Sequence, residues 1–334
     1  MRGLNSFMTE FQKQKNSKQP ESAGLGKEES VRKEHDPKKN KKPLARKKTL
    51  VAYSFILPNL IGFFIFTLIP IVFSLLLSFC EWDSGNPIRF VGLKNFITMF
   101  TKDSSFWIAL KNTLCYTLVT VPVTMVFALS LAILMNKELK GRVFFRSVLF
   151  FPYVASLVAV AVVWMALFNP DRGPVNSILM ALGMLNPPRW AASTKWALPT
   201  IIGLTVWKSM GYYMVVYLAA LQGVSGELYE AASLDGANQW KQFLHITWPS
   251  VTPTTFFILM MLMVSTFKSY DTMYITTQGG PGEATKVLAY HIYNSAFISS
   301  KFGYASAVAM VLLGIIMMVT LIQFKGEKKF TSYL

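Results

Sequence analysis

Residues 51–79 read VAYSFILPNLIGFFIFTLIPIVFSLLLSF, a run without a single charged side chain. About 20 consecutive apolar residues are enough for a helix to cross the hydrocarbon core of a bilayer. A basic segment, KKNKKPLARKK at 38–48, directly precedes the run. Because the apolar stretch is too long for a signal peptide and has no small-residue cleavage site, we predict a retained membrane helix.

Five further apolar runs follow along the chain, and each is near the length that spans a bilayer. Lipid offers no partners to backbone N–H and C=O groups, and the strands of a membrane barrel would alternate apolar with polar residues. The runs therefore predict helices, and the chain is predicted to be an all-α polytopic membrane protein with six transmembrane helices. The five runs are Leu114–Met135, Val148–Phe168, Leu198–Leu221, Phe256–Tyr274 and Ala305–Phe324.

The overall composition agrees with a membrane protein, since 52% of the residues are hydrophobic and only 15% are charged. Ordinary soluble domains have about 25% charged residues. The formal net charge of +16 could suggest a nucleic-acid partner. Much of this excess lies in the first 48 residues, however, and the rest lies in short loops between apolar runs. This distribution is the positive-inside pattern, so we expect a lipid bilayer and no nucleic acid as partner.

The basic loops also predict the orientation of the chain. The loop between the second and third runs and the tail after the sixth are rich in lysine and arginine, which favours the cytoplasmic side. We therefore expect a bacterial inner-membrane protein with cytoplasmic N- and C-termini. Residues 1–47 are polar and basic and are predicted to be a disordered tail, and residues 48–334 are predicted to form the membrane domain. The basic residues of the two segments are Lys137, Lys140, Arg142 and Arg146, and Lys325, Lys328 and Lys329.

The loop between the fourth and fifth runs, about residues 222–252, reads QGVSGELYEAASLDGANQWKQFLHITWPSVT. Two short helices are predicted in it. Ser225 can cap the first, and Gly236 stands where a left-handed C-terminal cap would fall. Asn238 can cap the second, which Pro249 is expected to end. Physical reasoning leaves two alternatives open, a rigid docking surface for another protein and an amphipathic helix lying on the membrane interface.

Within this loop, Glu230-Ala231-Ala232, Asp235-Gly236-Ala237 and the later Ile246-Thr247-Trp248-Pro249 resemble the EAA signature of ABC importer permeases. The spacing is similar to that of the carbohydrate-type branch, the maltose and glycerol-phosphate permease family. The resemblance extends over most of the chain from about Val51, and it implies the type I ABC importer permease fold. Three further segments are also similar to that branch, namely Phe90–Phe96, Gly141–Arg146 and Thr277–Pro281.

The resemblance implies that the loop is a coupling helix that docks on a cytoplasmic ATPase. The implied partners are two copies of that ATPase, a second homologous permease subunit, an extracellular solute-binding protein and a sugar substrate. The chain has no G-x-x-x-x-G-K-[ST] motif, so we expect no cofactor in this chain and ATP bound by the partner subunit. The residues that the resemblance places in the ATPase contact are Glu230, Ala231, Ala232, Asp235, Gly236 and Ala237.

Charged residues inside predicted spans are costly and are candidates for function. Lys208 falls near the middle of the fourth span. Its position fits a structural role and substrate contact equally well. Lys268 and Asp271 are three residues apart in the fifth, which predicts one helical face and favours a mutual salt bridge over substrate contact. Aromatic side chains that carry polar groups suit a carbohydrate, although packing between subunits explains them equally well. These aromatic candidates for the substrate path are Trp207, Tyr212, Tyr213 and Tyr217.

The outer loop with Gly279, Gly280 and Pro281 either contacts the binding protein or is a plain tight turn. No catalytic or metal-ligating cluster is evident, because His35, His245 and His291 are widely separated. An ion-coupled secondary sugar transporter would be expected to show internal repeats and broken helices near the midplane, and the sequence indicates neither. We therefore predict a non-enzymatic permease subunit of an ATP-driven ABC importer that translocates a sugar, with an oligosaccharide as the expected cargo.

Overall fold

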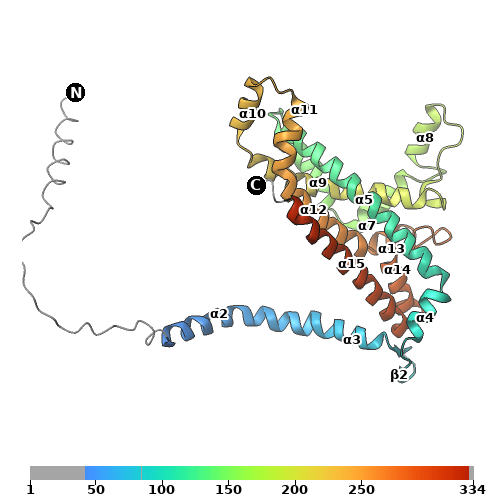
Figure 1. Cartoon of the computed structure of the whole chain (residues 1–334). Helices are drawn as coiled ribbons and strands as arrows, with labels where there is room; N and C mark the ends of the chain where they lie inside the picture. Colours follow the sequence, from blue (N-terminus) through green and yellow to red (C-terminus); the bar gives the residue numbers. More distant parts are fainter. Residues whose placement is uncertain (1–41, 84, 331–334) are drawn as a thin grey trace, which may run out of the picture. The chain divides into compact units, whose positions relative to one another are not determined.

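Helices form nearly all of the structure, a computed structural model that describes residues 42–83 and 85–330 (Figure 1). The chain divides into two units, residues 1–62 and residues 63–334. In the first unit, the described residues belong to helix α2 (Lys42–Phe63). Helix α2 includes residues 42–47 of the predicted disordered tail, and the rest of that prediction lies outside the described residues.

Five helical stretches are long and apolar enough to cross a membrane, and a sharply bent helix pair makes a sixth if it is counted as one span. The prediction of six spans is confirmed in this sense. The first stretch contains a π-helical turn, η1 (Phe64–Leu68), followed by α3 (Ile69–Leu77). The five stretches are Tyr53–Leu77, Ser104–Asn136, Ala197–Gln222, Gln239–Lys268 and Phe302–Gly326.

The bent pair corrects one prediction, since the run Val148–Phe168 is not a single helix. Helix α6 (Arg142–Val154) ends within it, and α7 (Leu157–Leu167) leaves at an angle of 101°. Ala155 and Ser156 between them have extended backbone, with ψ of 145° and 128°. Hydropathy measures apolar length and is blind to such a break. The prediction that no span is broken is therefore wrong. The absence of broken spans can no longer be used to distinguish an importer from an ion-coupled carrier.

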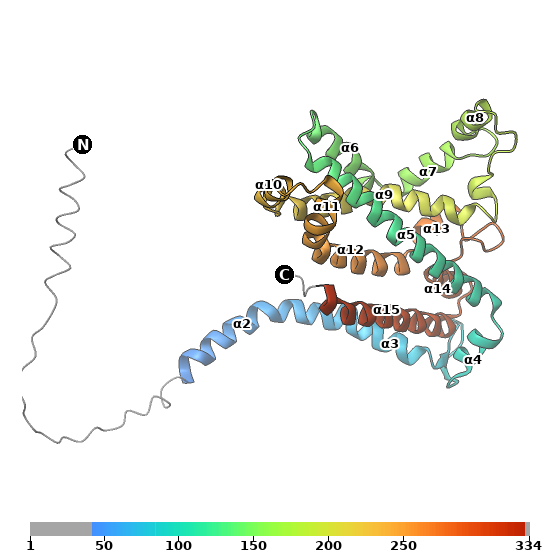
Figure 2. The ribbon, with the colours of Figure 1, turned by 45° about the horizontal axis from the view of Figure 1, so that its top comes forward.

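The core of the second unit is built on α5 (Ser104–Asn136) and α9 (Ala197–Gln222), which pack along one another (Figure 2). Helix α12 (Trp248–Lys268) packs against both, and α6 crosses α9. At that crossing a Cβ on Gly211 would lie 1.9 Å from the carbonyl oxygen of Leu149, so only glycine permits the contact. The buried side chains between the three long helices include Val121, Ala128, Met214, Tyr217 and Ile258.

The last long helix, α15 (Phe302–Phe330), packs against α3, α4 (Lys94–Thr101) and α14 (Leu288–Tyr293). Helix α5 begins ten positions before the predicted Leu114, because Asp103 caps it by accepting a hydrogen bond from the Phe106 N–H at 3.3 Å. The remaining elements at the loops are β1 (Cys80–Glu81) paired with β2 (Arg89–Phe90), α8 (Pro174–Ala181), η2 (Trp190–Ala192), α13 (Asp271–Thr276) and η4 (Asn294–Ile298).

Three short elements form the predicted loop 222–252, at the end of the bundle where α15 ends (Figure 1). They are α10 (Gly226–Leu234), α11 (Gln239–Gln242) and the π-helical turn η3 (Phe243–Thr247). Pro249 does not end the second helix, contrary to prediction. It lies in the first turn of α12, directly after η3, and the helical stretch continues from Gln239 to Lys268. Proline is tolerated in a first turn, and the wider π turn before it resets the hydrogen-bond pattern.

Candidate coupling segment and transport cavity

The coupling segment, defined here as residues 225–247, begins with the predicted caps. The hydroxyl oxygen of Ser225 accepts a hydrogen bond from the Glu227 N–H at 3.3 Å, and the Glu227 carboxylate lies in the positive first turn of α10. Gly236 has φ +77°, the left-handed conformation that favours glycine. The Ala237 N–H closes the end of the helix on the Ala232 carbonyl at 2.8 Å. The Ser225 and Gly236 predictions are confirmed.

Side-chain hydrogen bonds join the two halves of the coupling segment. The side-chain oxygen of Asn238 caps α11 by accepting from the Lys241 N–H at 2.9 Å, as predicted. The Gln242 amide donates to the hydroxyl of Ser233 on α10 at 2.9 Å. The hydroxyls of Tyr229 and Thr247 lie 3.0 Å apart. Since η3 continues directly into α12, these bonds connect α10 mechanically to the fifth span.

The outer surface of the coupling segment is exposed throughout. Helix α10 buries none of its side chains, and Leu234 is 90% exposed. Trp240 on α11 is 66% exposed. Exposed apolar side chains here fit both predicted alternatives, a docking surface for another protein and an amphipathic helix on the membrane interface. Of the predicted contact residues, Glu230, Ala231, Asp235 and Gly236 are exposed, and Ala232 and Ala237 are half-buried.

A cavity of ≈ 640 Å³ opens between the spans, and we call it the α9–α12 cavity. It lies beside the break between α6 and α7 and beside the break at the end of α12. The structure brings four of the predicted substrate-path residues to its wall, namely Lys208, Tyr213, Lys268 and Asp271. Other residues that line the cavity include Tyr116, Tyr153, Leu157, Ser209, Ser265, Ser269 and Tyr270.

The other three substrate-path candidates do not line this cavity. Tyr217 is 1% exposed and belongs to the core between the long helices. The ring of Tyr212 stacks on that of Tyr153, with centroids 4.4 Å apart. The ring of Trp207 lies 5.5 Å from that of Trp164 on α7. All three side chains therefore pack within this chain, and packing between subunits stays untested for them.

The relation predicted between Lys268 and Asp271 is wrong. Helix α12 ends at Lys268, Ser269 is extended with ψ 119°, and Asp271 begins α13. The two residues therefore do not share a helical face. No ion pair joins them among the residues that the structure describes, and the Asp271 carboxylate accepts from the N–H of Thr272 at 2.9 Å.

Lys208 instead holds the broken third span. Its ammonium donates three hydrogen bonds, to the carbonyls of Pro152 at 3.0 Å, Tyr153 at 2.9 Å and Ala155 at 3.0 Å. These carbonyls belong to the last turn and the C-cap of α6, where the helix has free acceptors and a negative dipole end. The sequence shows a lysine within an apolar run, but it does not show which distant backbone carbonyls accept hydrogen bonds from its ammonium group.

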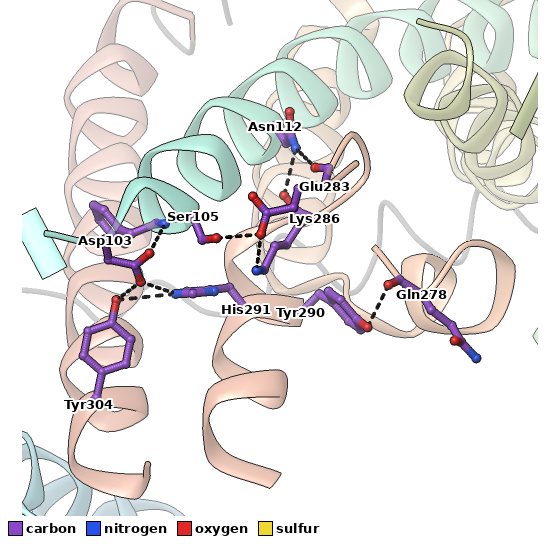
Figure 3. A network of polar contacts seen from close by, with 10 residues as sticks. Asp103, Ser105, Asn112, Gln278, Glu283, Lys286, Tyr290, His291 and Tyr304 are labelled. Atoms are coloured by element: carbon purple, nitrogen blue, oxygen red, sulfur yellow. Dashed lines mark hydrogen bonds and ion pairs between the residues drawn. The ribbon is translucent and has the colours of Figure 1, made fainter. Parts of the chain in front are cut away.

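The outer loop, residues 277–286, contains Gly279, Gly280 and Pro281 and is bonded firmly to the N-terminal part of α5 (Figure 3). The Asn112 amide donates to the carbonyls of Glu283 at 2.9 Å and Lys286 at 3.0 Å. The Lys286 ammonium lies 2.7 Å from the Glu283 carboxylate, which also accepts from the Ser105 hydroxyl at 2.5 Å. These hydrogen bonds, that of Lys286 first, lower the pKa of Glu283.

Beside this loop, the Nε2 atom of His291 lies 3.2 Å from the Asp103 carboxylate, which accepts a hydrogen bond from the Tyr304 hydroxyl (Figure 3). Burial lowers the pKa of His291, and the neighbouring Asp103 only partly opposes this effect. Burial would raise the pKa of Asp103, but the Tyr304 hydrogen bond and the His291 charge leave it lowered. The sequence did not point to this cluster, because the three histidines are widely separated and the partners of His291 are distant along the chain.

The fold and these sites define a polytopic helical membrane protein with an exposed, internally bonded helical segment and a polar cavity between its spans. Residues 113–325 match the family described as "Binding-protein-dependent transport system inner membrane component". The chain belongs to this family. It is therefore an ABC importer permease, and membership of the family argues against the ion-coupled secondary transporter considered above.

Curated relatives match over most of their length. The chain is 38% identical over 291 residues to "Probable ABC transporter permease protein YesP" of Bacillus subtilis (strain 168), covering 86% of this chain and 94% of the relative. It is 35% identical over 289 residues to "Arabinooligosaccharides transport system permease protein AraP" of the same organism, covering 84% and 91%. A solved bacterial alginate ABC transporter in complex with its periplasmic protein shares the fold, with TM-score 0.76, 24% identity and coverage of 86% and 98%.

Proposed function

We propose that this chain is the membrane-spanning permease subunit of an ATP-driven importer that translocates a sugar, and specifically an oligosaccharide. The observation that carries the proposal is the coupling segment, which is exposed on its outer surface and hydrogen-bonded to a helix that reaches the α9–α12 cavity. The cargo assignment is supported by the relative named for arabinooligosaccharides. Hydroxyl and aromatic groups in the cavity wall support it as well.

The partners are two copies of a cytoplasmic ATPase, a second homologous permease and an extracellular solute-binding protein. ATP is bound by the ATPase, since this sequence has no phosphate-binding loop. The exposed apolar side chains of Leu228, Leu234 and Trp240 give the coupling segment a surface for the ATPase to cover. The coupling segment and both chain termini then lie in the cytoplasm of a bacterial cell.

The geometry suggests how ATP hydrolysis is transmitted. A movement of the ATPase displaces α10, and the Tyr229–Thr247 hydrogen bond passes the displacement to η3 and α12. Helix α12 ends at Lys268, on the wall of the α9–α12 cavity. The cavity is therefore biased between inward-open and outward-open states from a remote site, as alternating access requires. The outer loop with Gly279, Gly280 and Pro281 serves the binding protein as a rigid contact.

Copurification and uptake test the proposal together. Affinity purification of the intact membrane complex through this chain is expected to recover an ATPase and a second permease, and proteoliposomes of the complex are expected to import sugar only with ATP. Glu230→Lys should abolish uptake while the chain still inserts, whereas Glu138→Lys, an acid-to-base change outside the coupling segment, should leave uptake largely intact. Sugar transport by the isolated chain without ATP would refute the proposal.

A further inference from the structure

The loop between the third and fourth spans, residues 169–196, contains helix α8 (Pro174–Ala181). Residues 173–188 of this loop include no charged side chain, although about one residue in four is charged in an ordinary soluble domain. Helix α8 projects away from the long helices α5, α9 and α12 in both views of the chain (Figure 1 and Figure 2). A segment that stands apart from the core and has no charges is a candidate contact surface.

The side chains that α8 presents outward are aliphatic. Ile178 is 60% exposed, Leu182 is 80% exposed and Leu185 is 92% exposed. Ile178 and Leu182 are four positions apart, a spacing that places them on one helical face. Leu185 follows directly after the turn that ends the helix. These three residues are the aliphatic face of α8.

Backbone hydrogen bonds fix the turn within this aliphatic face. Gly183 has φ +94°, and its N–H donates to the Met180 carbonyl at 3.0 Å. The N–H of Met184 donates to the Leu179 carbonyl at 3.0 Å. This pair of bonds is the Schellman motif, which closes a helix with a residue in the left-handed conformation. The exposed leucines therefore flank a defined turn.

Asn176 ties both ends of the loop to the first turn of α8. It is only 2% exposed, and its amide donates to the carbonyls of Pro170 at 2.9 Å and Pro188 at 3.1 Å. Its side-chain oxygen accepts a hydrogen bond from the Trp190 indole N–H at 2.6 Å. A buried polar group whose hydrogen bonds are made stabilises one conformation. The loop therefore holds the aliphatic face outward in a fixed frame.

Aromatic rings at the base of the loop indicate its depth relative to the bilayer. The Trp190 ring lies 4.9 Å from that of Phe168 and 6.0 Å from that of Trp196. Phe168 is the C-cap of α7 and Trp196 is the N-cap of α9, so these rings lie where the two helices meet the loop. Tryptophan is enriched at the headgroup level of membranes, because its ring is apolar and its N–H is polar. The base of the loop therefore belongs to the headgroup layer.

Basic side chains flank the uncharged segment on both sides. Arg172 precedes it, Arg189 and Lys195 follow it, and all three are exposed. Asp171 is the only acidic residue of the loop. No ion pair engages the three bases among the residues that the structure describes. Long basic side chains can reach lipid phosphates while the apolar groups beside them enter the acyl layer.

A protein that binds and leaves in each transport cycle fits this surface less well than lipid does. Taken as a whole, the interface of a non-obligate complex is about as apolar as the rest of a protein surface. The aliphatic face, by contrast, lies within a stretch that has no charged residue. An apolar face with basic flanks is typical of a helix that lies in the membrane interface.

We propose that α8 is an amphipathic anchor whose aliphatic face lies at the boundary between the headgroups and the acyl chains. The anchor is on the opposite side of the membrane from the coupling segment, because a single span, α9, separates the two. It holds the adjoining ends of α7 and α9 at the bilayer surface. The inference depends on the membrane-spanning fold and not on the cargo or on ATP.

Spin labelling measures the depth of α8. The membrane complex purified through this chain, with Cys80 and Cys115 replaced by serine, is reconstituted in phospholipid nanodiscs with a single label at Leu185→Cys. Its collision rates with oxygen, which concentrates in the acyl layer, and with a water-soluble nickel chelate are compared with those of a label at Asp171→Cys. We expect the oxygen-to-nickel ratio at Leu185 to be several-fold higher. Equal ratios would place Leu185 in water, and shielding from both reagents would place it against a protein. Either result overturns the inference.

A matched pair of variants tests the aliphatic face itself. Leu185→Asp and Thr194→Asp add the same charge to exposed positions of the same loop, but only Leu185 belongs to the aliphatic face. Because a charge in the acyl layer is costly, Leu185→Asp should lower the oxygen-to-nickel ratio of a label at Leu182→Cys several-fold, and Thr194→Asp should leave it unchanged. A ratio that Leu185→Asp does not alter overturns the inference. Neither measurement uses ATP, so their failure is distinct from failure of the proposed function.

Discussion

The phenolic hydroxyl of Tyr229 on α10 lies 3.0 Å from the hydroxyl of Thr247, at the last position of η3. This contact joins the exposed helix of the coupling segment to the helical stretch that ends at Lys268. Thr247 is 7% exposed, whereas α10 buries none of its side chains. The hydrogen bond is therefore a point where force on an exposed helix passes into the buried bundle.

Removing this hydrogen bond should uncouple the ATPase from transport. Tyr229→Phe keeps the ring and deletes a bond worth about 1 kcal/mol. We expect uptake to fall several-fold while ATP hydrolysis by the assembled importer changes less. The double variant Tyr229→Phe with Thr247→Val should be no worse than either single variant, because both remove the same interaction. Additive losses in a double-mutant cycle on uptake rate would show that the hydroxyl pair does not transmit the coupling.

Gly236 should be replaceable only at a cost in backbone strain. Its φ of +77° is strained for other residues, although a Cβ there would meet nothing within 4 Å. Gly236→Ala should therefore destabilise the turn by about 1 kcal/mol and reduce uptake. Gly226→Ala is the matched control, since Gly226 lies in the same segment, has no positive φ and has open space for a Cβ. Equal uptake rates for the two variants would contradict this account.

Gly211→Ala should disrupt the crossing of α6 and α9. The new Cβ would lie 1.9 Å from the Leu149 carbonyl oxygen and 2.6 Å from its carbon, so the backbones must separate. We expect a loss of about 1–3 kcal/mol, the usual cost of overpacking, seen as a lower thermal unfolding temperature of the purified complex. Gly203→Ala on the same helix should be tolerated, because the nearest atom is a Trp164 ring carbon at 3.8 Å. An unchanged thermal unfolding temperature in Gly211→Ala would contradict the close contact of α6 and α9 at this position.

Acid should loosen the outer loop through His291. Its pKa is lowered from the ordinary 6.5 by burial, so the folded protein holds it neutral. In an unfolded or opened segment, His291 has its ordinary pKa of 6.5 and binds a proton at a higher pH than it does in the folded protein. The folded network therefore loses stability as the pH falls from 6.5 through the lowered pKa of the folded state. The lowered pKa of Asp103 acts in the same direction, but only below its ordinary 3.8.

Hydrogen exchange of residues 277–286, corrected for intrinsic rates, measures this loosening between about pH 7.5 and pH 5.5. The amides are expected to exchange faster at the lower pH in the natural protein. In His291→Gln the pH dependence should disappear, because the titrating group is gone. A pH dependence that persists in the variant would assign the effect to another group.

Sequence alone predicted the elements whose signal is local. Apolar runs longer than the bilayer core placed the spans, and the caps at Ser225, Gly236 and Asn238 follow from the hydrogen-bonding capacity or backbone freedom of single residues. The signature around Glu230 gave the family. These features depend on neighbours within a few positions, which a sequence displays directly.

Features that depend on distant contacts were missed or predicted wrongly. The break between α6 and α7 is held by Lys208, more than fifty positions away along the chain. The turn at Ser269 separated Lys268 from Asp271 inside one apolar run, and a π turn let α12 continue through Pro249. The His291 cluster joins α14 to the start of α5 and to α15. Hydropathy and periodicity contain no information on such pairings.

Transport by this chain depends, in our proposal, on docking of the coupling segment on a nucleotide-driven ATPase outside the chain. A photo-crosslinking amino acid at Leu234, the most exposed apolar side chain of α10, tests it most directly in an assembled importer that still transports. We expect a crosslink to a cytoplasmic ATPase whose yield changes with ATP. We expect no such crosslink from Ile178 on α8 (Pro174–Ala181), a helix that lies well apart from α10 (Figure 1). An importer that transports fully and never yields the crosslink at Leu234 would contradict it.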